Sequence, residues 1–240
     1  MDGYGQYCPV ARAMDVLGSR WTLLIVRDLL CYDIRRFNEL ARGLPRMSRG
    51  LLSERLRQLQ EAGIIERHAG NGTPAEYRLS KAGMELRPVV EALLRWGSKW
   101  TFEEPTSNEL DPVLLMWWMR RRTRTEELPD QRVVAQFDFR RVDGSFWLVL
   151  DRSDVSVCLK RPKFDIDLWI EADLSVFYQV WLGRLEFDEA VRQGGVAVRS
   201  TPELERRFSS WFRWSPAVDL LAVTEHDPTS TSEALSRQQL

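Results

Sequence analysis

Apolar residues recur at helical spacing along the N-terminal part of the chain. The pattern predicts short helices over residues 10–17, 21–30 and 36–42, of which the second is apolar on almost every side and is expected to be buried. After a turn, a fourth helix is expected to begin behind Ser48, a residue type that caps helix N-termini, and to stop at Gly63. Four helices joined by short turns therefore open the chain.

The predicted fourth helix has an apolar face and a polar face. Leucines recur on one side at positions i, i+4 and i+7, which is the spacing of residues that dock a helix onto a core. The two faces consist of Leu52, Leu56 and Leu59, and of Arg49, Ser53, Arg57 and Gln60. Such a helix is expected to rest on its own domain and to present its polar side outward.

A hairpin and a long helix follow. Residues 64–69 and 75–79 have the pattern of short strands, and the Asn-Gly pair between them favours a tight turn. Ser80 is then expected to cap one helix that extends to Trp100, with a mild kink at Pro88. Four helices, a hairpin and a last helix, in this order, are typical of a winged helix-turn-helix.

The pattern changes after an acidic, proline-containing stretch at residues 103–108, which is expected to join two domains. Strands and helices alternate beyond it and predict an α+β layer with one mostly antiparallel sheet. Helices are expected at residues 110–121, 174–182, 187–193 and 202–211, and strands at residues 132–139, 145–150, 155–159, 164–170 and 196–199. We therefore divide the chain into residues 1–104, residues 109–220 and a polar, flexible tail at residues 221–240.

Composition narrows the class of protein. The 240 residues carry 34 basic and 35 acidic side chains, so the formal net charge is −1, yet residues 35–58 hold seven Arg against two Glu. A local basic surface of this kind is what phosphate binding requires. The three Cys and two His are too few and too scattered for a disulfide framework or a metal site. No signal peptide or membrane-spanning segment is recognisable, so we expect a cytoplasmic, nucleoid-associated protein that contacts no membrane.

The basic segment indicates double-stranded DNA as the partner. Arg49, Ser53 and Arg57 are side chains that can reach base edges and phosphates in a major groove. The further contacts are expected at Ser48 at the helix start, at Arg35, Arg36 and Arg46 beside it, and at Arg67, Asn71 and Gly72 in the hairpin. The alternative is a solvated helix whose arginines pair with Glu39 and Glu54. Because no nucleophile–base pair, glycine-rich phosphate loop or cofactor motif is present, we expect neither an enzyme nor a cofactor.

Several segments of this part resemble the HxlR family of bacterial regulators. They are residues 8–25, 36–40, 53–59, 61–67 and 76–83, with the sequences CPVARAMDVLGSRWTLLI, RFNEL, SERLRQL, EAGIIER and EYRLSKAG. The resemblance covers about residues 7–100 and implies a homodimer, built through the first and last helices, that binds an inverted repeat in operator DNA. The resemblance favours DNA binding by the fourth helix over the solvated-helix alternative.

Cys8 has two interpretations. In some HxlR members, as the resemblance implies, a cysteine at this position senses oxidants or electrophiles, and Arg12 one turn further along would favour its thiolate form. The same Cys-Pro pair occurs in members without a redox role. Redox sensing and a structural role therefore both stay open for Cys8.

The second part resembles the sterol carrier protein fold over about residues 109–218. The matching segments are residues 167–174, 180–185, 189–192, 196–199 and 208–212. The resemblance implies an apolar cavity between sheet and helices that holds a lipid-like or aromatic molecule, and the ten Trp of the chain favour it. The expected lining residues are Trp117, Trp118, Phe139, Trp147, Trp169, Phe177 and Trp181. The alternative is that these rings fill a core.

Together these patterns predict a homodimeric regulator whose first domain binds operator DNA and whose second domain senses a small apolar or aromatic ligand. Two alternatives stay open. In one, the second domain is only structural, with Cys8 or nothing as the sensor. In the other, the second domain is a carrier or enzyme that the winged helix anchors.

Overall fold

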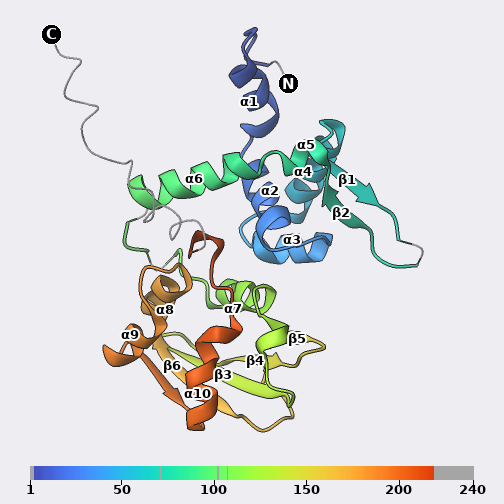
Figure 1. Cartoon of the computed structure of the whole chain (residues 1–240). Coiled ribbons are helices and arrows are strands. Elements are labelled where there is room, and N and C mark those ends of the chain that lie inside the picture. The colour runs from blue at the N-terminus through green and yellow to red at the C-terminus, as the bar shows by residue number, and fades with distance from the viewer. Residues whose placement is uncertain (1–2, 71, 102, 107, 219–240) are drawn as a thin grey trace, which may run out of the picture.

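A winged helix lies beside a second unit built on a sheet, as Figure 1 shows for the computed structural model, which describes residues 3–70, 72–101, 103–106 and 108–218. The N-terminal unit consists of α1 (Pro9–Leu17), α2 (Thr22–Cys31), α3 (Phe37–Gly43), α4 (Arg49–Glu61), β1 (Ile65–His68), β2 (Glu76–Leu79), α5 (Lys81–Met84) and α6 (Arg87–Trp100). The two strands pair antiparallel, with Ile65 opposite Leu79. The predicted winged helix-turn-helix is therefore confirmed.

Local capping decides where α4 begins and ends. The Ser48 hydroxyl accepts a hydrogen bond from the Leu51 N–H at 3.2 Å, as an N-cap residue does. Beyond the end of the helix, Gly63 has a φ of +70°, a left-handed conformation that costs glycine little. Both ends lie within a residue or two of their predicted positions.

The prediction of one helix from Ser80 to Trp100 is wrong, because two helices occupy this segment. Ser80 caps only the short α5, where its hydroxyl accepts a hydrogen bond from the Gly83 N–H at 3.1 Å. Pro88 lies in the first turn of α6, where a missing N–H is tolerated, but it cannot donate to the Met84 carbonyl as a continuous helix would require. The proline thus separates two helices instead of kinking one.

The second unit contains one five-stranded sheet. Its elements are α7 (Pro112–Arg121), η1 (Thr125–Glu127), β3 (Val133–Arg140), β4 (Phe146–Leu150), β5 (Val155–Cys158), β6 (Leu168–Asp173), α8 (Leu174–Trp181), α9 (Phe187–Arg192), β7 (Val196–Arg199), α10 (Pro202–Phe208) and η2 (Ser209–Trp211). Two predicted boundaries were wrong: β6 begins after residues 164–167, and the last predicted helix is divided at Phe208 into α10 and a 3₁₀ turn.

The sheet is mixed, with the strand order β5-β4-β3-β6-β7. The pairs β5–β4, β4–β3 and β6–β7 run antiparallel. The central pair β3–β6 runs parallel, with Ala135 opposite Leu168. A parallel pair needs a long crossover, which here is made of β4, β5 and the loop before β6.

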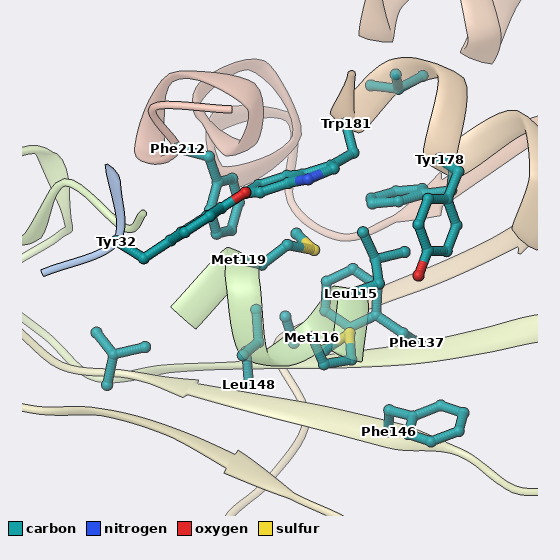
Figure 2. Close-up of a cluster of buried hydrophobic side chains, with 14 of the residues drawn as sticks. Tyr32, Leu115, Met116, Met119, Phe137, Phe146, Leu148, Tyr178, Trp181 and Phe212 are labelled. Carbon is teal, nitrogen blue, oxygen red and sulfur yellow. The ribbon is translucent and has the colours of Figure 1, made fainter. Parts of the chain in front are cut away.

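Side-chain alternation along β3 separates the two faces of the sheet. Phe137 meets Phe177 of α8 edge-on at 5.9 Å between ring centroids, and it lies 6.2 Å from the ring of Phe208 of α10. Leu115 and Met116 of α7 lie over the same face (Figure 2). The helices thus cover one face, where most of the core lies. A separate, smaller cluster on the other face consists of Val134, Trp147, Val149 and Ile166.

One apolar cluster runs from the winged helix into the second unit. It contains Leu40 and Leu56 from the first unit and Trp181 from the second. Tyr32, which follows α2, points into this cluster (Figure 2). Its ring stacks on Trp118 of α7, with 6.0 Å between centroids and 14° between planes. The core is therefore continuous across the junction.

Arg121 adds a polar connection between the two units. Its Nε donates to the Tyr32 carbonyl at 3.1 Å, and a terminal nitrogen donates to the Asp33 carbonyl. Its other terminal nitrogen lies 3.6 Å from the Glu39 carboxylate. Glu39, considered from the sequence as a partner for the arginines of α4, is thus engaged by α7 instead.

Candidate nucleic-acid interface

α4 is anchored by its leucines and presents its polar face to solvent. The three leucines of its apolar face are at most 2% exposed. Arg49, Ser53 and Arg57 are all exposed on the opposite side. Because the buried leucines hold the helix on a rigid core, the structure brings these three polar residues together on one accessible surface, which we call the α4 face.

α3 positions the first arginine of the α4 face. A terminal nitrogen of Arg49 donates to Asn38 Oδ1 at 2.6 Å, and the guanidinium lies 4.9 Å from the centroid of the Phe37 ring. Asn38 was not singled out from the sequence, since only the packing of α3 against α4 reveals it. These contacts hold the guanidinium beside the start of α4, where it can form charge-assisted hydrogen bonds with an anion.

Arg57 is engaged within its own helix. It pairs with Glu54 at 2.7 Å and also with Glu61. The hydrogen bond from Arg57 lowers the pKa of the Glu54 carboxyl. In the protein without DNA, Arg57 therefore pairs with carboxylates of its own helix, as the solvated-helix alternative expects. Solvent-exposed ion pairs of this kind are weak, so these carboxylates can be exchanged for a phosphate.

The N-terminus of α4 is open to an approaching anion. Gly50 is exposed, and a Cβ placed on it would have no neighbour within 4 Å. Ser48 is exposed as well, with its hydroxyl bound to the Leu51 amide. The first amides of a helix have no acceptor within the helix and favour anions such as phosphate.

The three flanking arginines lie in different surroundings. Arg35 is 2.8 Å from Asp33, and Arg36 forms an isolated antiparallel bridge with Glu76 of the wing. Arg46 donates to the carbonyl of Asn108, in the segment that leads into the second unit. Arg35 and Arg36 therefore lie beside the wing, whereas Arg46 faces the junction.

The wing carries the remaining predicted contacts. Arg67 is exposed on β1, opposite Tyr77 of β2. Gly72 has a φ of +75° and open space around it, which suits a tight tip. Asn71 lies outside the described residues. The two strands of the predicted hairpin are therefore paired, with Gly72 in the turn between them.

Cys8 precedes α1 and is partly exposed. The thiols of Cys31 and Cys158 are also free and partly exposed. The position of Cys8 is compatible with both of the roles considered for it.

The seven aromatic residues expected to line one cavity lie in three different places. Phe139, Phe177 and Trp181 are buried beneath the helices; Trp117 and Trp118 belong to α7 at the junction; and Trp147 and Trp169 belong to the other face of the sheet. None of them lines the cavity of about 270 Å³ in the second unit or the cavity of about 210 Å³ at the junction of the two units. The expectation of one shared cavity is corrected, because rings on opposite faces of a sheet cannot surround the same space.

A different cavity, of about 270 Å³, lies in the second unit. Its apolar wall includes Phe187, Phe212 and Trp214, and its charged residues include Glu186 and Arg124. The rings of Phe187 and Trp214 are stacked, with 6.1 Å between centroids. The sequence did not indicate this site, because its walls come from turns and short segments far apart in the chain.

Two classes of site are absent from the described residues. No group of three or more His, Cys, Asp or Glu side chains is arranged to hold a metal ion there. Among those same residues, no helix has the length and apolarity needed to cross a bilayer.

Comparison with known proteins identifies relatives of the winged-helix part. The profile of the HxlR family, described as an HxlR-like helix-turn-helix, matches residues 16–105. The uncharacterized HTH-type transcriptional regulator Rv3095 of Mycobacterium tuberculosis is 42% identical over 95 residues, which are 38% of this chain and 58% of that protein. The chain thus spans little more than half the length of this relative. The uncharacterized HTH-type transcriptional regulator YvaP of Bacillus subtilis is 37% identical over 98 residues, which are 40% of this chain and 90% of that protein.

Solved structures match the same share of the chain. PA1607 is 38% identical, with 43% of this chain and 72% of that chain covered and a TM-score of 0.40. The redox regulator HypR in its reduced form is 30% identical, with 38% of this chain and 92% of that chain covered and a TM-score of 0.35.

Proposed function

Because the chain belongs to the HxlR-like helix-turn-helix family of transcriptional regulators, we propose that it binds double-stranded operator DNA as a homodimer and reads it through α4. The observation that carries the proposal is the α4 face, on which Arg49, Ser53 and Arg57 stand exposed above a fully buried row of leucines. Arginine at such a position binds guanine edges or phosphates in a major groove. The open helix start supplies amide donors for a phosphate.

The proposed dimer rests on apolar side chains that the single chain leaves uncovered. On α6, Leu93, Trp96 and Trp100 are 48%, 57% and 65% exposed, and on α1 Val10 is 70% exposed. α1 buries only Ala11, and it projects away from the rest of the molecule (Figure 1). Exposed apolar surface of this extent marks an interface. Two-fold pairing through such surfaces would present two α4 helices to two half-sites, as in other dimeric helix-turn-helix proteins, and imply an inverted repeat.

Substitution of Arg49 tests DNA reading. An operator is first selected from genomic fragments that bind the purified protein, and affinity is then measured by fluorescence anisotropy. Arg49→Ala is expected to weaken specific binding by about 5- to 150-fold, since a good guanidinium–base contact contributes about 1–3 kcal/mol. Arg192→Ala, which changes an exposed arginine on α9, is the matched control and should bind like the wild type. Equal affinity of the Arg49 variant would remove α4 from its proposed role.

A charge placed on α6 tests the dimer. Leu93→Glu is expected to yield a folded monomer by light scattering and to lose most of its operator affinity, because a carboxylate cannot be buried unpaired in an apolar interface. Leu159→Glu, at a residue 58% exposed in the second unit, is the control and should stay dimeric. A dimeric Leu93→Glu protein would place the interface elsewhere.

Two finer proposals concern residues 109–220: a sterol-carrier-protein-like fold and the sensing of a small apolar ligand. The aromatic wall of the 270 Å³ cavity favours a ligand, although through residues other than the seven first considered. Native mass spectrometry of the purified protein tests this: a retained apolar molecule, lost on Trp214→Ala, supports sensing. Absence of any ligand, together with no thermal shift from apolar compounds, would leave the second unit structural, with Cys8 as the remaining candidate sensor.

A further inference from the structure

Arginines from both units lie against one tryptophan at the junction. Trp117 of α7 is 5% exposed, and the guanidinium carbons of Arg42 and Arg120 lie 5.5 and 5.1 Å from the centroid of its ring. Arg42 belongs to α3 of the winged helix, whereas Arg120 belongs to α7 of the second unit. Two like charges are therefore held close together, one from each unit, and we call this pair the junction arginines.

The junction arginines continue the α4 face. Asn38, which accepts a hydrogen bond from Arg49, lies one turn before Arg42 on the same side of α3. α3 packs against α7, the helix that carries Arg120 (Figure 1). In helix-turn-helix proteins the helix before the reading helix crosses the DNA backbone, and α3 has this position here. Basic side chains thus extend from the start of α4 across α3 and onto the second unit.

The charge of the junction arginines is only partly compensated. Among the described residues, no carboxylate forms an ion pair with Arg42, which is exposed. The Nε of Arg120 donates to the Val155 carbonyl, and one terminal nitrogen lies 3.9 Å from the carboxylate of Asp154, which is itself 72% exposed. An exposed pair at this distance is weak, so both guanidinium groups can interact with another anion.

The electrostatic surroundings of Arg120 agree with this excess of positive charge. The pKa of Arg120 lies below the ordinary arginine value, because burial and the neighbouring charges of Arg121 and Arg42 outweigh the attraction of Asp154 and Glu39. Glu39 is also engaged by Arg121, at 3.6 Å. An anion bound at this place would offset the repulsion between the guanidinium groups.

We propose that the second unit takes part in DNA binding, and that Arg42 and Arg120 together hold backbone phosphate beside the half-site read by α4. The DNA backbone is a dense row of anions, and arginine binds phosphate through a planar fork of N–H donors. Contacts to phosphate position a protein on DNA without reading its sequence directly. The second unit thus adds affinity, whereas α4 selects the sequence. The inference rests on the proposed function, because it requires DNA bound at α4.

The salt dependence of operator binding tests the proposal. The full-length protein is titrated with the selected operator by fluorescence anisotropy at several KCl concentrations. Arg42→Gln and Arg120→Gln should each bind about threefold or more weakly, and should each reduce the slope of log K against log salt by about 0.9, for every half-site occupied. Arg120→Lys keeps the charge and should retain the wild-type slope.

Arg207→Gln is the matched control. Arg207 of α10 also donates to a distant backbone carbonyl, that of Glu127, and also lies 3.9 Å from a carboxylate, that of Glu203. This variant removes the same charge and the same kind of contacts from the second unit, but away from α3. It should bind the operator with the affinity and slope of the wild type.

A scrambled duplex separates phosphate contact from base reading. Arg42→Gln and Arg120→Gln should weaken binding to the operator and to the scrambled duplex by the same factor, because every duplex has the same backbone. Arg49→Ala should instead weaken binding to the operator more than binding to the scrambled duplex.

The outcomes that contradict the proposal are specific. A wild-type slope in either glutamine variant, a lowered slope in Arg120→Lys, or an equal loss in Arg207→Gln would overturn it. Weaker binding with an unchanged slope would show that the junction arginines only hold the two units together. Absence of operator binding by the wild type would refute the proposed function and this inference with it, so the two failures are distinguishable.

Discussion

Tyr32 is one of the side chains that join the cores of the two units, so Tyr32→Ala tests whether they fold as one. The residue is 6% exposed and its ring stacks on Trp118. Removing the ring exposes or empties about 150 Å² of buried surface, which at about 25 cal/mol per Å² amounts to about 4 kcal/mol. Measured truncations of buried aromatic residues cost a similar 3–5 kcal/mol or so.

The assay is urea unfolding at one fixed protein concentration, followed by tryptophan fluorescence and by far-UV circular dichroism. The wild type should show coincident transitions, since one apolar cluster spans both units. Tyr32→Ala should lower the free energy of unfolding by about 3–5 kcal/mol, and Tyr32→Phe, which keeps the stacked ring, by less than about 1 kcal/mol. A loss of less than about 1 kcal/mol in the alanine variant, or two separate wild-type transitions, would refute a shared core.

Two further predictions concern the winged helix. Gly83→Ala should lower the free energy of unfolding in urea by about 1–3 kcal/mol or more, because its Cβ would lie 2.2 Å from the Ile64 carbonyl oxygen. Gly50→Ala, with open space around the new Cβ, should be neutral or stabilising, and equal effects of the two variants would contradict the close approach at Gly83. Burial raises the pKa of Asp28 more than Arg27 lowers it, so the folded protein holds this proton more tightly than the unfolded chain does. The free energy of unfolding contributed by Asp28 should therefore decline as pH rises from the ordinary carboxyl pKa to the raised one. Asp28→Asn should flatten that part of the stability profile above the ordinary carboxyl pKa, and an unaltered slope would assign it to other groups.

Local rules explain the parts of the structure that could be predicted. The periodic leucines of α4, the cap at Ser48 and the stop at Gly63 act within a few residues of one another, so the pattern alone located the helix and its exposed arginines. The hairpin was predictable for the same reason, because its turn and alternation are local. Pro88 is also a local signal, but its effect is stronger than the mild kink expected, since it separates α5 from α6.

The remaining features depend on contacts between distant residues. The resemblance to the sterol carrier protein fold implied that the rings of the second unit line one cavity, but the parallel pairing of β3 with β6 places Phe139 and Trp169 on opposite faces of the sheet. Asn38 became a partner of Arg49 only through the packing of α3 beside α4.

By itself the sequence determined the winged helix and the exposed polar face of α4, since periodicity and capping are properties of short segments. Tertiary structure alone decided that Tyr32 joins two units into one core and that arginines from both units meet at Trp117. Burial, register and the meeting of distant charges follow from how segments pack together, and no short stretch of sequence contains that information.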